Sequence, residues 1–331
     1  MWMRAVQIAF VYVGTVVGAG FATGKEIVQF FTQYGSIGVV TIAMSGCLFI
    51  FFGTRLMVMA NRLQARSYEQ FNAYLFGKMS VVVNLFMFVV LFSVTSVMLS
   101  GAGAVFEEQL HMPAYVGLLF TMLLAFVTML FGLNGILSVN MVVVPLMIIF
   151  SLSIALINES DIVWTKPPLA AFFSPFAYVA FNLAMAQVVL VPLATEVRDE
   201  RAIRLGGWLG GILLMFILFS SHFALSLLPN LPSYSIPMAE VVKRSLTSFY
   251  GLYVVMIYGE IFTSFIAGVF GLHRKLALFS PTPTFVLVML LFAMYAFSLV
   301  GYHALLTVLY PLFGYVSIIF IFLLFYRKMP S

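Results

Sequence analysis

Long apolar runs separated by short polar stretches make up almost the whole chain. An α-helix needs about 20 predominantly apolar residues to cross the hydrocarbon core of a bilayer. The pattern therefore predicts an all-α membrane protein with about ten transmembrane helices. The predicted spans are residues 5–30, 36–59, 80–105, 114–131, 136–157, 172–195, 205–228, 248–271, 284–301 and 304–326.

The connections between these spans are short and polar. Residues 158–168 predict an external loop, and residues 60–78 predict a turn with a short surface helix near 68–76. Residues 229–246 contain three prolines and end in an amphipathic piece, which is too polar to span and is expected to lie over the outer face. No connection exceeds about 20 residues. We therefore expect one transmembrane domain, residues 1–331, without a soluble domain.

Composition narrows the function classes further. Apolar residues make up 63% of the chain and charged residues 8%, with a mean hydropathy of +1.12. The single cysteine, Cys47, excludes an internal disulfide framework and a cysteine metal cluster. No P-loop and no zinc, haem or iron–sulfur spacing is present, so we expect no cofactor and no use of ATP. No nucleophile–base pair converges either, so we do not expect an enzyme.

The net charge of +5 indicates topology rather than a nucleic-acid partner. With an even number of spans, twelve of the sixteen lysines and arginines fall on the side that holds both termini. Positive residues gather on the cytoplasmic side of membrane proteins. We therefore expect a multi-pass protein of the bacterial cytoplasmic membrane with both termini cytoplasmic. The first run contains a polar break and no small-residue cleavage site, so we expect a retained helix and not a signal peptide.

The first span carries an unfavourable cluster of small and charged residues. Four of the thirteen residues from 14 to 26 are glycine, and the charges Lys25 and Glu26 follow them. Glycine costs about 1 kcal/mol relative to alanine inside a helix, and a charge near the bilayer centre costs roughly 2.5–3.5 kcal/mol. We therefore expect an interruption at 17–24 whose exposed backbone binds a ligand. The alternative is close helix packing through Gly-xxx-Gly spacings.

The sixth span carries a second candidate interruption at 181–187. Asn182 and Gln187 are amides at mid-depth in an apolar run, and Pro192 removes a backbone donor. The alternative is that both amides bond to neighbouring helices. Spans one and six occupy equivalent positions in two five-helix halves, residues 5–157 and 172–326. Paired interruptions of this kind indicate the site of an inverted-repeat transporter.

The eighth and third spans carry further polar side chains. Glu260, Thr263 and Ser264 share one helical face. A carboxylate with two hydroxyls is an oxygen set that suits an alkali cation or a proton, although membrane Ser and Thr often bond only their own backbone. On span three, a serine face that includes Ser96 contacts either a neighbouring helix or the solute.

These features together resemble a known architecture. Ten spans with interruptions in one and six resemble the LeuT-type fold of the amino acid–polyamine–organocation superfamily. The stretch 12–26, Tyr-Val-Gly-Thr-Val-Val-Gly-Ala-Gly-Phe-Ala-Thr-Gly-Lys-Glu, resembles more narrowly the YkvI-like bacterial membrane proteins.

The resemblance implies a sodium site and a solute site. It places the Na⁺ ligands at the carbonyls of Gly14, Val17 and Glu260 and at the hydroxyls of Thr263 and Ser264. Glu260 departs from the family, which usually has a small residue there, so Na⁺ and H⁺ coupling both stay open. Span five lacks the lysine of some proton-coupled relatives, which favours Na⁺.

The solute of such folds lies between the two interruptions. The resemblance places it against Ala19, Gly20, Phe21, Ala22 and Thr23, against Phe181, Asn182, Ala184 and Ala186, and beside Ser96. Phe181 would be an aromatic lid, and the amides of span one would bind a carboxylate. Lys25, Glu26 and Gln187 are candidate gating or coupling residues, and Glu26 or Glu260 is a candidate partner for an ammonium.

The resulting expectation is a secondary active transporter for a small solute, such as an amino acid or related metabolite. It would work by alternating access in the lipid bilayer, as a monomer or homodimer, with Na⁺ or H⁺ as the coupling ion. The alternative is a membrane ligand sensor on the same scaffold, which binds a small molecule without net transport.

Overall fold

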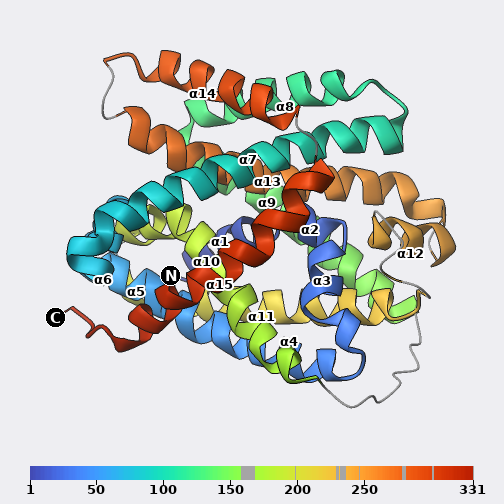
Figure 1. Cartoon of the computed structure of the whole chain (residues 1–331), viewed down its shortest axis with the longest axis horizontal. Coiled ribbons are helices and arrows are strands. Elements are labelled where there is room, and N and C mark those ends of the chain that lie inside the picture. Colours follow the sequence, from blue (N-terminus) through green and yellow to red (C-terminus); the bar gives the residue numbers. More distant parts are fainter. Residues whose placement is uncertain are drawn as a thin grey trace.

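The computed structural model describes most of the chain. It leaves out residues 158–167, 198, 229–230, 232–235, 246, 278–280, 300–301 and 331, and also the side chains of 19, 151–152, 154–157, 245, 302–312 and 315. The described residues form helices joined by turns, without a strand among them (Figure 1). The predicted external loop at 158–168 and most of the connection at 229–236 lie outside the described residues.

Helices lie where the apolar runs predict them. The first predicted span is divided into three helices, and the second joins two α-helices through a π-helical turn at Phe49–Gly53. The other eight spans each match one helix. The bounds are α1 Trp2–Val16, α2 Ala19–Ala22, α3 Lys25–Phe30, α4 Ile37–Leu48, α5 Thr54–Leu63, α6 Tyr68–Phe76, α7 Ser80–Leu110, α8 Ala114–Leu130, α9 Gly132–Ile157, α10 Leu169–Val197, α11 Glu200–Leu225, α12 Pro237–Ser245, α13 Tyr250–Leu276, α14 Pro283–Ser298 and α15 Tyr302–Tyr326.

Six of the described helical stretches are long and apolar enough to cross a membrane. They contain α4–α5, α6–α7, α9, α10, α11 and α13. The helices α1, α8, α14 and the described part of α15 are apolar but have only 10–17 residues. Length and composition therefore establish a multi-pass helical protein, and the count of ten spans stays a prediction.

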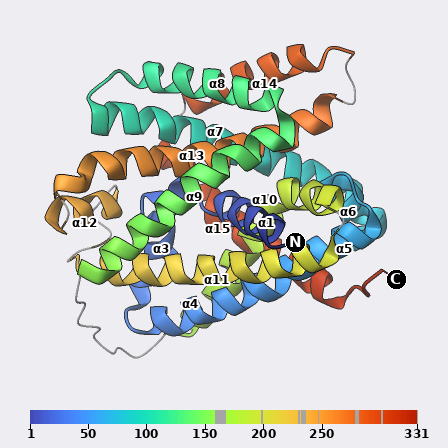
Figure 2. The same cartoon turned by 180° about the vertical axis from the view of Figure 1, so that it is seen from behind.

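The short surface helix predicted near 68–76 is present as α6, and the amphipathic piece that ends at 246 forms α12. The side chain of Ser67 accepts a hydrogen bond from the backbone N–H of Gln70 and so caps the start of α6. In Figures 1 and 2, α5, α6 and both chain termini lie at one end of the molecule, and α12 lies at the opposite end. This arrangement agrees with the predicted topology, in which the termini and the 60–78 connection share one side.

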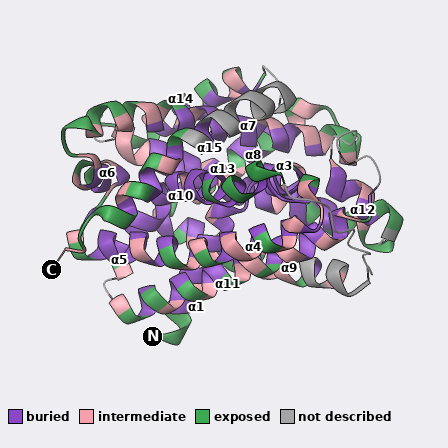
Figure 3. Cartoon of the chain, turned by 60° about the horizontal axis from the view of Figure 1, so that its bottom comes forward, coloured by how far each residue is buried: buried purple, intermediate pink, exposed green. Residues whose placement is uncertain are grey.

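Glycines on α11 allow close packing of the helices around it. Gly206 and Gly210 face α1, where an added Cβ would lie 2.6 Å from Ile8 and 2.5 Å from Tyr12. Gly207 and Gly211 face the second span instead. Gly-xxx-Gly packing of the kind considered for span one is thus present on α11, and Gly14 and Gly18 of span one also lie close to α9 and α13. Among the six long stretches, α10 and α13 are the most buried, and they run through the centre of the molecule (Figure 3).

Arginine side chains hold the C-terminal segment against α5. The Arg55 guanidinium donates hydrogen bonds to the carbonyls of Leu324 at 2.7 Å, Phe325 at 3.1 Å and Arg327 at 2.7 Å. Arg62 donates to the carbonyl of Pro330 at 3.1 Å. These charge-assisted bonds tie the end of the chain to the second span.

We expect Arg55→Ala to release this segment. Trypsin should then remove a C-terminal epitope at Arg327 and Lys328 several-fold faster, because the three carbonyls lose their common donor. Arg66→Ala is the control, since Arg66 is an exposed arginine just after α5. Equal cleavage of the two variants would show that Arg55 does not hold the segment.

Candidate functional site

The first span is interrupted between α1 and α3. After Val16 the backbone becomes extended at Val17, with φ −76° and ψ 123°. The four-residue α2 follows, and Gly24 then adopts φ +82°, in the left-handed region that favours glycine. The chain thus leaves helical geometry twice, at Val17 and at Gly24. Nearby carbonyl groups therefore lack hydrogen-bond partners in their own helix.

Other elements satisfy those carbonyls. The Ser264 hydroxyl on α13 donates to the carbonyl of Val17 at 2.5 Å. The Tyr253 hydroxyl donates to Ala22 at 3.4 Å, and the Met238 N–H at the start of α12 donates to Thr23 at 3.1 Å. Since buried backbone groups need partners, α12 and α13 hold the interruption in place.

The predicted ion ligands divide into two groups. Val17 and Ser264 lie together, and an added Cβ at Gly18 would be 3.1 Å from the Ser264 hydroxyl. Thr263 donates to the Glu260 carbonyl at 2.9 Å on its own helix. The carbonyl and hydroxyl of each pair are hard oxygen donors of the type that alkali cations accept.

Gly14 faces another helix, α9. An added Cβ there would strike the Asn140 side chain, whose Oδ1 is buried without a hydrogen-bond donor among the described residues. Asn140 was not singled out from the sequence. It brings a polar oxygen to the α1–α9 contact, and no sequence signal predicts this pairing of helices.

The predicted interruption of span six is wrong. α10 is one helix from Leu169 to Val197, and Pro192 lies inside it. The Asn182 amide donates to the Tyr178 carbonyl at 2.9 Å, and the Gln187 amide donates to Ala184 at 3.0 Å. Both amides thus bond the carbonyls of their own helix, so polarity at mid-depth does not break it here.

A cavity of about 50 Å³, which we call the Glu26 cavity, lies among α1, α7, α10 and α13. The helical face of α10 that lines it carries Phe181, Asn182, Met185 and Val188. Their spacing follows the helical repeat. Because α10 stays helical, Ala184, Ala186 and Gln187 turn to other faces and do not line the cavity.

Glu26 is the charged group of this cavity. It is 5% exposed, and its carboxylate lies against Gly20 of α2. Lys25 beside it is half-buried and lines neither described cavity.

On α7, the residue expected to line the solute site was Ser96. Ser96 is buried, and its hydroxyl donates to the Phe92 carbonyl at 2.8 Å. Thr95 and Met98 line the Glu26 cavity instead. The rotation of α7 that selects them is fixed by packing, since Thr95 lies against Gly268 of α13.

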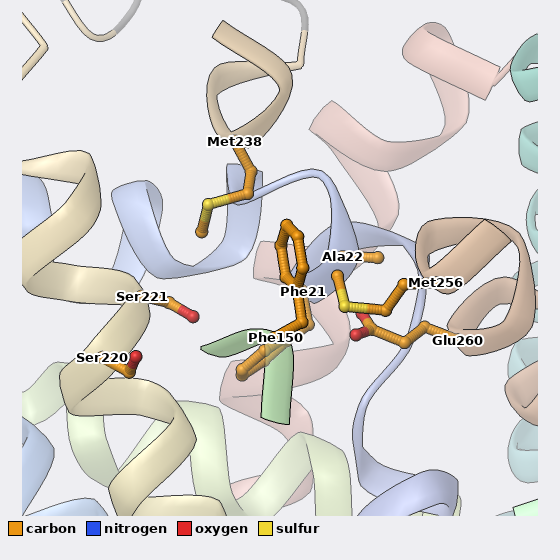
Figure 4. A pocket seen from close by; sticks show the side chains of 8 residues that line it. All are labelled: Phe21, Ala22, Phe150, Ser220, Ser221, Met238, Met256 and Glu260. Carbon is orange, nitrogen blue, oxygen red and sulfur yellow. The ribbon is translucent and has the colours of Figure 1, made fainter. Parts of the chain in front are cut away.

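A second cavity, the Glu260 cavity, lies toward the α12 end and measures about 10 Å³ (Figure 4). The Phe21 ring stands at its centre, between Met238 and Phe150. Glu260 lies on one side of this ring and Ser220 and Ser221 on the other. Ala22 also lines this cavity, whereas Thr23 is buried with its hydroxyl on the Gly20 carbonyl at 3.1 Å. The side chain of residue 19 lies outside the described part.

Glu260 is the second buried carboxylate of the site. It is 2% exposed, and its Oε2 has no hydrogen-bond partner among the described residues. A buried carboxylate is unfavourable as a free anion and is stabilised by a cation or a proton.

Comparison with known proteins relates the chain to two proteins of Bacillus subtilis (strain 168). It is 44% identical over 335 residues to the uncharacterized membrane protein YkvI, and the match covers 98% of this chain and 96% of that protein. It is 23% identical over 326 residues to the uncharacterized protein YyaD, covering 96% and 95% respectively. No family model matches the chain.

Similar folds occur among solved transporter structures. Mhp1, a nucleobase-cation-symport-1 family transporter, was solved in a closed conformation with bromovinylhydantoin bound. It matches with a TM-score of 0.64 at 12% identity, over 88% of this chain and 70% of that one. A manganese transporter of Eremococcus coleocola matches with a TM-score of 0.59 at 12% identity, over 97% and 78%. The chain therefore belongs to the family of the membrane protein YkvI, and its fold is that of the LeuT-type transporters.

Proposed function

We propose that the protein is a secondary active transporter that moves a small solute, such as an amino acid or related metabolite, by alternating access. The observation that carries this proposal is the interruption of span one between two small cavities. Irregular backbone at membrane depth is tolerated only where protein buries it or where it lines a cavity. Transporters use such interruptions to bind solutes and ions.

The packing of the helices supports two bodies that move against each other. α1 packs on α11, and α10 packs on α4 and α5. On the other side, α7 packs on α8, α13 and α14. We assign spans one, two, six and seven to one body and three, four, eight and nine to the other, within two inverted five-helix repeats.

We further propose that the coupling ion binds where the two bodies meet, between Val17 and Ser264. The residues fit an alkali cation, because the Val17 carbonyl comes from the α1 side and the Ser264 hydroxyl from α13. On α13, Thr263 and Glu260 add a second hydroxyl and a second carbonyl. Gly14 is the weakest member of the proposed set, since its Cα faces Asn140 of α9. We also propose that both termini are cytoplasmic.

Flux through purified protein tests the proposed function. Proteoliposomes that contain the protein should accumulate a solute that stabilises it, and an imposed inward Na⁺ or H⁺ gradient should raise that accumulation. Empty liposomes and dissipated gradients are the controls. A ligand that binds saturably but shows neither uptake nor exchange would favour the sensor alternative over transport.

A further inference from the structure

Each of the two cavities beside the interruption contains one buried carboxylate and no basic side chain. Glu26 belongs to one cavity and Glu260 to the other, and different sets of helices complete each of them. No lysine, arginine or histidine of the described residues lines either cavity. A low-dielectric site with one sign of charge favours ligands of the opposite sign.

Glu26 lies at the place where a solute carboxylate was expected. The nearest atoms that a Cβ at Gly20 would meet all belong to the Glu26 side chain. A carboxylate bound by the backbone of α2 would therefore face a second carboxylate at close range. Like charges at that distance repel strongly away from water. The position suits a positive group instead.

The other surfaces of the Glu26 cavity are mainly apolar, aromatic or thioether groups, among them Phe181, Met98 and Met185. A metal ion needs several ligand atoms, and the described residues contain no cluster of three or more His, Cys, Asp or Glu side chains. One carboxylate beside an aromatic ring and hydrocarbon fits an ammonium with a hydrocarbon body.

The Glu260 cavity repeats this chemistry at the α12 end. Its carboxylate shares the space with Phe21, Phe150, Met238 and Met256 (Figure 4). The Glu260 Oε2 atom is free to accept a hydrogen bond. Gly20, which lies against the Glu26 carboxylate, and Phe21, which lines the Glu260 cavity, are neighbours in the interrupted segment.

We propose that the solute is a small protonated amine, and that Glu260 and Glu26 receive its ammonium group in turn on the two sides of the interruption. This inference rests on the proposed function, since two receiving carboxylates imply a solute that moves between them. The Glu26 cavity of about 50 Å³ holds only a few heavy atoms, so the amine must be small in this conformation.

The test uses purified full-length protein and three related small probes: ethylamine, alanine and propionate. Ethylamine lacks the carboxylate of alanine, and propionate lacks its amine. We expect calorimetry and thermal stabilisation to show binding of ethylamine, weaker binding of alanine and none of propionate. Glu26→Gln should weaken ethylamine binding about 30-fold or more, because it removes one partner of a buried charge pair.

Three further variants separate charge from folding. Glu26→Asp keeps the charge and should retain binding, and Glu196→Gln removes an exposed carboxylate and should match the wild type. Any weak ethylamine binding left in Glu26→Gln should disappear when Glu260→Gln is added. Melting of each variant without ligand shows whether it is folded.

Four results would overturn the proposal: wild-type ethylamine affinity in folded Glu26→Gln, residual binding unchanged by Glu260→Gln, tighter binding of propionate than of ethylamine, or stabilisation by MnCl₂ with none by ethylamine. Uptake of an anionic solute would contradict the proposal of an amine solute but would support the proposed transport function. Binding of ethylamine without exchange in proteoliposomes would instead contradict the proposed transport function, while Glu26 would remain the partner of the ammonium group.

Discussion

Leucine at Gly206 should prevent stable assembly of the helices around α11. An added Cβ at this position would lie 2.6 Å from Ile8 and 2.9 Å from the carbonyl oxygen of Ala5. The second contact is backbone, so a rotamer change cannot relieve it. Overpacking of this kind typically costs about 1–3 kcal/mol of unfolding free energy. The α1 helix would have to move, and the interruption that follows it would move too.

The measurement compares Gly206→Leu with Gly251→Leu. Gly251 is an exposed helical glycine with no atom within 4 Å of an added Cβ. Leucine there should stabilise slightly, because glycine is unfavourable inside helices by about 1 kcal/mol. We expect a lower apparent melting temperature and less monodisperse protein for Gly206→Leu only. Equal behaviour of the two variants would show that α1 and α11 can separate without loss.

Much of the helical layout follows from local sequence, because a helix that crosses a bilayer requires a long apolar run. The start of α6 follows from its cap, Ser67. The division of span one also has a local cause, since Gly24 takes a backbone conformation that most residues avoid. These features could be predicted because each depends on neighbours in the chain.

The differences between prediction and structure concern choices that the tertiary structure makes. Asn182 was read as a sign of interruption, yet its amide bonds a carbonyl of its own helix. Ser96 was expected to face the solute, whereas packing of α7 on α13 brings Thr95, not Ser96, to the Glu26 cavity. Asn140 was missed because only the packing of α1 against α9 brings its side chain to Gly14. Sequence periodicity identifies a helical face, but it does not say which face meets the cavity.

Alanine at both Thr263 and Ser264 should abolish dependence on Na⁺, if the ion binds where we propose. The Ser264 hydroxyl and the Val17 carbonyl oxygen are 2.5 Å apart. Two oxygens that bind one cation at right angles, with bonds of about 2.4 Å, lie about 3.4 Å apart. Ion binding would therefore separate these atoms and replace their hydrogen bond with two ligand bonds. The ion would thus act on the contact that joins the interruption to α13.

Because the double variant also loses the hydrogen bond to Val17, which is worth about 1 kcal/mol, its melting temperature alone decides nothing. The informative quantity is the difference between melting in NaCl and in choline chloride, together with the Na⁺ dependence of uptake. Thr128→Ala with Ser153→Ala is the matched control, since both hydroxyls bond only their own helix on α8 and α9. The control should respond to Na⁺ as the wild type does. A full Na⁺ response in Thr263→Ala/Ser264→Ala would place the coupling ion elsewhere, and loss of H⁺-driven uptake in Glu260→Gln would then identify a proton as that ion.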